Sequence, residues 1–133
     1  MSSIFSKIVS GEIPCYKVAE NDEFLAFLDI MPLATGHTLV IPKKETDYIF
    51  DIEDEAYQRL WAFAKEVAVV LKEKVPCKRV GLSVIGLEVA HAHIHLIPLQ
   101  QISDMNFSKE KVPAPQQELA SLARLLFEAG SKA

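Results

Sequence analysis

The chain has 133 residues, a length that favours one domain with a sizeable hydrophobic core. Half of its residues are hydrophobic and 24% are charged, as in ordinary globular domains, and no apolar run approaches the roughly 20 residues of a membrane helix. The formal net charge of −4 argues against extended nucleic acid as a partner, because phosphate backbones demand a basic surface, but it leaves a single nucleotide open. The N-terminus has no signal-peptide pattern. Cys15 and Cys77 form neither a CxxC pair nor a disulfide framework, so we expect a cytoplasmic protein with no membrane partner.

Apolar periodicity and turn residues divide the chain into short elements. Gly11 ends the first helix, Asn21 and Asp22 form a hairpin turn, Asp51 is expected to cap the long helix, and Gly130 is expected to follow the last one. The predicted elements are a helix over 3–9, strands over 16–20, 23–28 and 38–41, a helix over 51–74, strands over 79–85 and 91–97, and a helix over 115–129. Residues 104–114 are expected to form a loop.

This order of elements predicts the fold class. Short connections favour antiparallel neighbours. We therefore predict an α+β domain with one five-stranded antiparallel sheet, one long helix covering a face of it, and short N-terminal and C-terminal helices.

Residues 91–97 carry the strongest chemical signal. His91, His93 and His95 are three of the four histidines and alternate with apolar residues. Successive side chains of a strand point to opposite faces, so the three imidazoles should share one face while Ala92 and Ile94 enter the core. Imidazole is both a common metal ligand and a side chain that titrates near neutral pH. From the residues alone, a strand with satisfied histidines, a metal site, and an acid-base or nucleophile cluster all remain open.

Several blocks of the first hundred residues together resemble the histidine triad (HIT) family, and within it the Hint-like nucleotide-binding proteins. The blocks are 4–8 with 12–14, 26–30, 36–44 and the histidine stretch 91–97. The resemblance implies a HIT-like fold, with a nucleotide-binding domain over 1–103 and a C-terminal loop and helix, 104–133, packed on the same domain.

The resemblance also implies a site for a purine nucleotide or nucleoside phosphoramidate. In the family, the residue matching His93 is the nucleophile on the α-phosphate and forms a nucleotidyl-histidine intermediate. His95 would bond a phosphate oxygen or the leaving group, His91 and His37 would complete a polar wall, and Asp29 would accept from the ribose hydroxyls. The implied apolar slot for the base consists of Ile4, Phe5, Ile8, Ile13, Phe27 and Ile30.

The sequence departs from the family pattern in two places. Ser3, Ser6 and Glu45 stand where many bacterial members have two cysteines and a histidine that bind zinc, so we expect no metal and no other cofactor. The loop before the histidines is short, and Leu87 and Glu88 occupy positions where the family has glutamine and a hydroxyl residue. A carboxylate at Glu88 would repel a phosphate, so activity could be altered.

The leading hypothesis is a nucleotidyl hydrolase or transferase, such as a phosphoramidase. The alternatives are a nucleotide-binding module with little turnover and a metalloprotein that uses the histidine face directly. We also expect a homodimer. The resemblance implies pairing through the long helix and the fourth strand. That strand would otherwise be an open edge, and the helix carries Trp61, Ala62 and Val69 as apolar residues beyond those that face the sheet.

Overall fold

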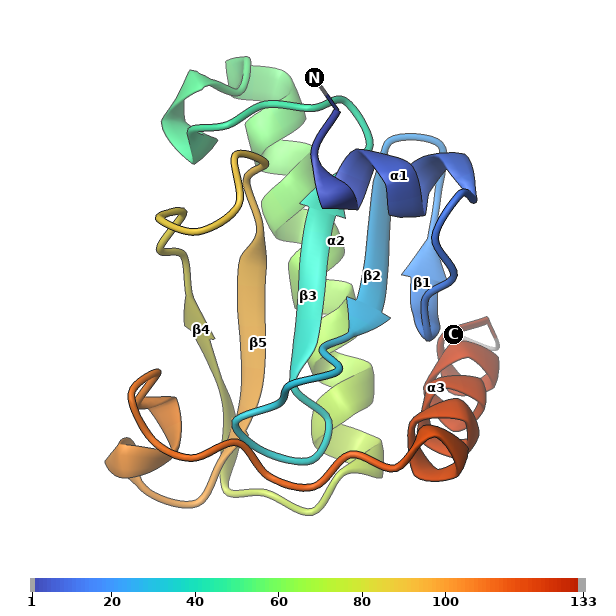
Figure 1. Cartoon of the computed structure of the whole chain (residues 1–133), viewed down its shortest axis with the longest axis vertical. Coiled ribbons are helices and arrows are strands. Elements are labelled where there is room, and N and C mark those ends of the chain that lie inside the picture. The colour runs from blue at the N-terminus through green and yellow to red at the C-terminus, as the bar shows by residue number, and fades with distance from the viewer. Residues whose placement is uncertain (1, 132–133) are drawn as a thin grey trace.

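Residues 2–131 are described by a computed structural model of the chain. Its helices and strands follow the predicted order (Figure 1). They are α1 (Ile4–Ser10), β1 (Lys17–Glu20), β2 (Phe24–Leu28), β3 (Thr38–Pro42), the 3-10 helix η1 (Ile49–Asp51), α2 (Asp54–Lys74), β4 (Arg79–Ser83), β5 (Ile94–Leu99), the 3-10 helix η2 (Ile102–Met105) and α3 (Gln116–Ser131).

The five strands form one antiparallel sheet in the order β1-β2-β3-β5-β4, which confirms the predicted α+β fold. β4 is one edge strand, and β1 is the other. Figure 1 shows α2 behind the sheet, α1 across the front of β3 and β2, and α3 beside β1. α3 contacts both β1 and α2, so the C-terminal helix joins the main core.

The strands separate two layers of apolar side chains. Behind the sheet, Leu60, Phe63, Val67 and Leu71 of α2 pack against the even-numbered residues of β2 and β5 and against α3. In front, a smaller cluster consists of Phe5 from α1 with Leu25, Phe27, Leu39 and Ile41. Because neighbouring residues of a strand face opposite layers, the odd-numbered residues of β5 lie on the α1 side.

The helix ends follow from capping chemistry, with two corrections to the predicted boundaries. The Ser3 hydroxyl accepts from the Ser6 N–H at 3.0 Å and caps α1, and Gly11 ends it with φ of +89°. Asp51 does not cap the long helix, because Ile49 turns into the core and the chain forms η1 first. α2 starts later, capped by the Glu53 carboxylate, which accepts from the Glu55 N–H at 3.1 Å.

The end of α3 also differs from the prediction. Gly130 lies inside the helix rather than after it, and the helix continues to Ser131. A glycine inside a helix costs stability relative to alanine but does not stop it.

The histidine strand is shifted relative to the prediction. β5 starts at Ile94, so only His95 of the three histidines lies in the ladder. Before it, the Ala92 N–H donates to the Thr46 carbonyl at 2.7 Å instead of to a neighbouring strand. β5 then continues through Pro98, because its pairing with β3 already ends at Leu96 and the missing N–H removes no ladder bond on that side.

Across residues 2–131, no helix is both long enough and apolar enough to cross a membrane.

Candidate active site

Four imidazole rings and one phenyl ring form a continuous row on the α1 side of the sheet. Ala92, Ile94 and Leu96 enter the core under α2, so the alternation that the sequence predicted does hold. The ring centroids of His93 and His95 lie 4.9 Å apart, and those of His95 and His37 lie 5.2 Å apart. At the other end, Phe5 contacts both His93 and His91 edge-on, with centroids at 5.0 and 5.8 Å. All four imidazoles are buried.

The position of the proton on His93 is set by the chain itself. Its Nδ1 lies 2.9 Å from the carbonyl oxygen of His91. A carbonyl only accepts, so Nδ1 carries the hydrogen and donates. In the neutral ring, Nε2 then has a free lone pair, which is the state that a nucleophilic histidine needs.

The tautomers of His37 and His95 are coupled in the same way. The Leu33 N–H donates to Nδ1 of His37 at 3.0 Å, so neutral His37 carries its proton on Nε2. That Nε2–H lies 3.0 Å from Nδ1 of His95 and donates to it. Neutral His95 therefore carries its proton on Nε2, the ring atom that His37 does not engage.

Burial keeps both of these rings neutral at physiological pH. Desolvation, together with the charges of His95 and Lys111, lowers the pKa of His37 to about 3. Desolvation and the charge of His93 lower the pKa of His95 to about 4. The hydrogen-bonded series from the Leu33 N–H through His37 to His95 is thus uncharged, and its last member presents the Nε2–H of His95 as a donor.

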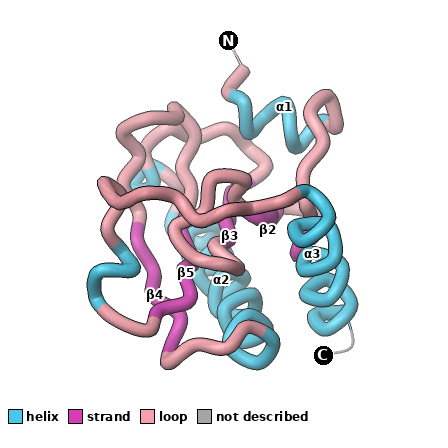
Figure 2. The backbone as a smooth tube through the Cα atoms, turned by 60° about the horizontal axis from the view of Figure 1, so that its bottom comes forward, coloured by secondary structure: helices cyan, strands magenta, loops and turns pink. Residues whose placement is uncertain are grey.

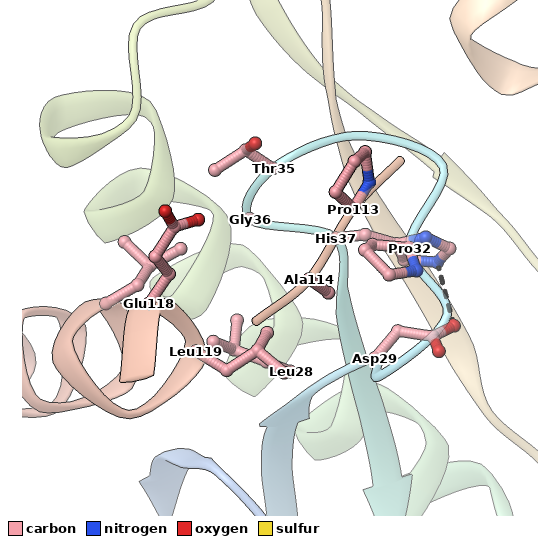
Figure 3. A pocket seen from close by; sticks show the side chains of 11 residues that line it. Leu28, Asp29, Pro32, Thr35, Gly36, His37, Pro113, Ala114, Glu118 and Leu119 are labelled. Atoms are coloured by element: carbon pink, nitrogen blue, oxygen red, sulfur yellow. Dashed lines mark ion pairs between the residues drawn. The ribbon is translucent and has the colours of Figure 1, made fainter. Parts of the chain in front are cut away.

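Asp29 follows β2 and lies beside the hydrogen-bonded pair of His37 and His95. Its Oδ1 accepts from the Met31 N–H at 2.8 Å, and its Oδ2 lies 3.6 Å from Nε2 of His37, the pair marked in Figure 3. Burial raises the pKa of the Asp29 carboxyl, opposed by the Met31 N–H. Among residues 2–131, no hydrogen bond is donated to Oδ2, which is available to a ligand hydroxyl.

A small hollow lies behind Asp29 and His37, where Pro113 and Ala114 approach the β2–β3 loop (Figure 3). Its volume is about 30 Å³, which corresponds to one water molecule. The hollow therefore cannot accept a nucleotide.

A larger cavity of about 480 Å³ opens in front of His93 and His95. Five of the predicted site residues line it, and they are Asp29, His37, Glu88, His93 and His95. His91 and the six residues of the expected base slot do not line it. Among these, Phe5 and Phe27 are buried in the front cluster, whereas Ile4 and Ile30 are exposed at 52% and 66%.

Two further residues of this cavity had no functional signal in the sequence. Phe107 and Lys111 come from the segment between η2 and α3 and line the cavity together with the histidines. The Phe107 ring contacts the His95 ring edge-on, with centroids 4.8 Å apart. The spacing of the residues in this segment is not periodic, so no face or partner could be assigned to it.

His91 belongs to a separate hydrogen-bond network at the N-terminus of α1. Its Nε2–H donates to the Pro42 carbonyl at 2.7 Å, and its Nδ1 accepts from the Ser3 hydroxyl at 2.8 Å. The Glu45 carboxylate accepts from the Ser3 N–H and the Ser6 hydroxyl, at 2.6 and 2.7 Å. These bonds lower the pKa of Glu45 to about 2.

This network is formed by the positions that the sequence comparison singled out for a zinc site, and its donor set does not fit that metal. Zinc sites are formed by thiolates, imidazoles and carboxylates, whereas Ser3 and Ser6 offer neutral hydroxyls. Both nitrogens of His91 already have protein partners.

A second group, Asp29, His37 and His95, has ligand-type atoms within 4.8 Å of one another. It also fits a metal poorly, because Nε2 of neutral His37 carries a proton as long as Nδ1 accepts from the Leu33 N–H. The arrangement matches a hydrogen-bonded chain better than a ligand set.

Fold and site together define an α+β protein with a row of buried histidines, in which the central His93 has its Nε2 lone pair free beside a cavity. Comparison with known proteins is consistent with this class: the HIT domain family model matches residues 10–102. The chain belongs to the HIT family.

Three relatives illustrate the similarity. A HIT-like protein of Borreliella burgdorferi is 40% identical over 102 residues, which cover 71% of this chain and 73% of that protein. The adenosine 5'-monophosphoramidase hnt1 of Schizosaccharomyces pombe is 39% identical over 99 residues, 74% of either chain. The crystal structure of a Hit-like protein involved in cell-cycle regulation from Bartonella henselae superposes with a TM-score of 0.82 at 30% identity, over 96% of both chains.

Proposed function

We propose that this protein binds purine nucleotides and hydrolyses nucleoside phosphoramidates through a nucleotidyl-histidine intermediate on His93. The observation that carries the proposal is the hydrogen bond from Nδ1 of His93 to the His91 carbonyl, which leaves Nε2 as a lone-pair nitrogen beside the cavity. The similarity to a yeast adenosine 5'-monophosphoramidase supports the choice of substrate class.

In the first step, Nε2 of His93 attacks the α-phosphorus. A phosphorus–nitrogen bond to the imidazole forms, and the bond to the leaving amine breaks. The amine takes one proton from solvent as it departs. The His91 carbonyl, which holds the Nδ1 hydrogen, stabilises the positive charge that the ring acquires.

His95 assists as a hydrogen-bond donor rather than as a proton source. With a pKa of about 4 it has no extra proton to give at neutral pH. Its Nε2–H, fixed by the bond from His37 to Nδ1, can donate to a phosphate oxygen as charge develops. In the second step, water attacks phosphorus and gives one proton to solvent, the bond to His93 breaks and returns its electron pair to Nε2, and the nucleoside monophosphate is released.

Asp29 supplies the contact that selects a ribonucleoside. A carboxylate with one free oxygen can accept hydrogen bonds from a vicinal diol, and Oδ2 of Asp29 lies at the same cavity as His93. The exposed side chain of Ile30, next to Asp29, offers apolar surface for the base.

A homodimer is part of the proposal. β4 is an edge strand, and Leu82 within it and Ile85 just after it are 42% and 44% exposed. They line a hollow of about 560 Å³ together with Tyr48, Phe50 and Trp61. The Trp61 Nε1–H is buried without an acceptor among the described residues, and an acceptor in a second copy would satisfy it.

A second candidate function, nucleotide binding with little turnover, is favoured by one observation. Glu88 lines the cavity that contains His93, and its carboxylate would repel an incoming phosphate. Both candidate functions include nucleotide binding, so only the rate of substrate turnover distinguishes them.

The test measures adenosine phosphoramidate hydrolysis and AMP binding by wild type and His93→Ala. We expect the variant to lose turnover while AMP affinity stays within a few-fold, because the Asp29 contact remains. In His93→Gly, added imidazole should restore part of the turnover, as it can enter the vacated position. Wild-type rates in His93→Ala would refute the proposal, and binding without turnover by the wild type would favour the second candidate.

A further inference from the structure

The segment between η2 and α3 lies outside the matched domain, which ends at residue 102, and yet it forms one side of the cavity. Figure 2 shows it running across the molecule to α3. The Val112 N–H donates to the Pro32 carbonyl in the β2–β3 loop at 3.0 Å, and the Asn106 side chain accepts from the Ser108 N–H at 2.9 Å. The first bond holds the segment against the loop that carries Asp29 and His37, and the second shapes a turn within the segment.

Lys111 is placed by this segment at the cavity. Its Nζ donates to the Phe107 carbonyl at 3.2 Å, and its side chain is half-buried. Lys111 lines the same cavity as Asp29, His37 and His95. Its positive charge adds to the desolvation that lowers the pKa of His37 and His95, and it opposes the burial that raises the pKa of Asp29.

The charges around the cavity explain why this cation matters. The described residues that line it include two carboxylates, Asp29 and Glu88, and two histidines that burial keeps uncharged, His37 and His95. Lys111 is the one lysine or arginine among the same described residues. A phosphate entering the cavity without Lys111 would meet carboxylates and no fixed positive charge.

We propose that Lys111 binds the phosphate of the substrate, so that the region after the HIT domain supplies the charge that the short loop at Leu87 and Glu88 does not. This inference rests on the proposed function. Two of the three donors of a lysine ammonium remain after the bond to Phe107 and can reach a phosphate oxygen. The product AMP then binds through its phosphate as well as through its ribose.

The experiment compares Lys111→Met with Lys109→Met, which makes the same change in the same segment but removes a lysine that pairs with Asp104 at 3.6 Å and does not line the cavity. Affinities for AMP and for adenosine are measured by calorimetry at low salt. Lys111→Met should weaken AMP binding by about tenfold and leave adenosine unchanged, whereas Lys109→Met should change neither. Lys111→Arg should restore most of the AMP affinity, because the cation is retained.

Three outcomes overturn the inference. AMP affinity within twofold of wild type in Lys111→Met would exclude a phosphate contact. Equal weakening of AMP and adenosine, with no rescue in Lys111→Arg, would indicate a structural role. Failure of the wild type to bind AMP would overturn the proposed function as well, whereas full turnover by His93→Ala would overturn that function and leave the Lys111 contact standing.

Discussion

Replacing His37 with phenylalanine should change the pH dependence of folding in a way that the structure specifies. The variant loses the hydrogen bond to His95 and leaves the buried Leu33 N–H without its acceptor. A lost hydrogen bond costs about 1 kcal/mol, and an unsatisfied buried N–H costs about 1–3 kcal/mol. At pH 7 we therefore expect a destabilisation of about 2–4 kcal/mol.

At lower pH this difference should shrink. The pKa of His37 is about 3 in the folded chain against an ordinary value of 6.5, so the unfolded chain binds the proton first. The stability tied to neutral His37 is complete above pH 6.5 and is lost as the pH falls toward 3. Between pH 6.5 and 5 the loss is about 2 kcal/mol, at 1.36 kcal/mol for each unit. His37→Phe escapes this loss, so its deficit relative to the wild type should fall from about 2–4 kcal/mol at pH 7 to about 0–2 kcal/mol at pH 5.

Urea unfolding, followed by the fluorescence of Trp61, measures the destabilisation at pH 7 and at pH 5. Thr38→Val is the control, because it removes a buried hydroxyl that donates to the Gly36 carbonyl at 2.8 Å and carries no titrating group. Its effect should be the same at pH 7 and pH 5. If the destabilisation by His37→Phe is equally independent of pH, His37 is not held neutral by burial and the assignment of its tautomer falls.

Three other changes test separate parts of the structure. Glu88→Gln should tighten AMP binding at low salt, by up to about tenfold, because it removes a carboxylate from the cavity, and unchanged affinity would place that side chain away from the phosphate. Ile85→Glu should convert the proposed dimer to a monomer in light scattering, while a monomeric wild type at micromolar concentration would contradict the dimer itself. Gly36→Ala should lower stability by about 1–3 kcal/mol in thermal unfolding, because Gly36 has φ of +92° and an added Cβ would lie 3.1 Å from Val75; an unchanged midpoint would mean that this loop adapts.

The elements that were predicted correctly are those whose signal is local. Alternation placed Ala92 and Ile94 in the core, and turn chemistry placed the hairpin between β1 and β2. Where long-range hydrogen bonds or contacts set the start of an element, the sequence pattern did not predict that boundary. The start of β5 shifted because the Ala92 N–H bonds to Thr46, and α2 started late because Ile49 enters the core first.

The residues of the candidate site also divide into those with a local sequence signal and those positioned by long-range contacts. Alternation alone placed His91, His93 and His95 on one face, and the resemblance to a known family brought in Asp29 and His37. Alternation could not show that the nitrogens of His91 are occupied by Ser3 and Pro42, because the partners are 88 and 49 residues away. The sequence gives no signal for Phe107 and Lys111 for a related reason, since their segment has no periodicity and is positioned by long-range contacts such as the bond from Val112 to the β2–β3 loop.

The hydrogen-bond network of Ser3, Ser6, Glu45 and His91 fixes the start of α1 to the sheet through protein groups alone, so this attachment does not require a zinc ion. A thiolate–zinc site couples folding to the free metal concentration and exposes sulfur to oxidants, whereas hydroxyls and a carboxylate do neither. The bonds to Glu45 persist wherever its carboxyl stays ionised, which with a pKa of about 2 covers all but strongly acidic conditions. A chelator should therefore leave Phe5 in place against His93, and α1 should stay attached to the sheet in metal-starved surroundings.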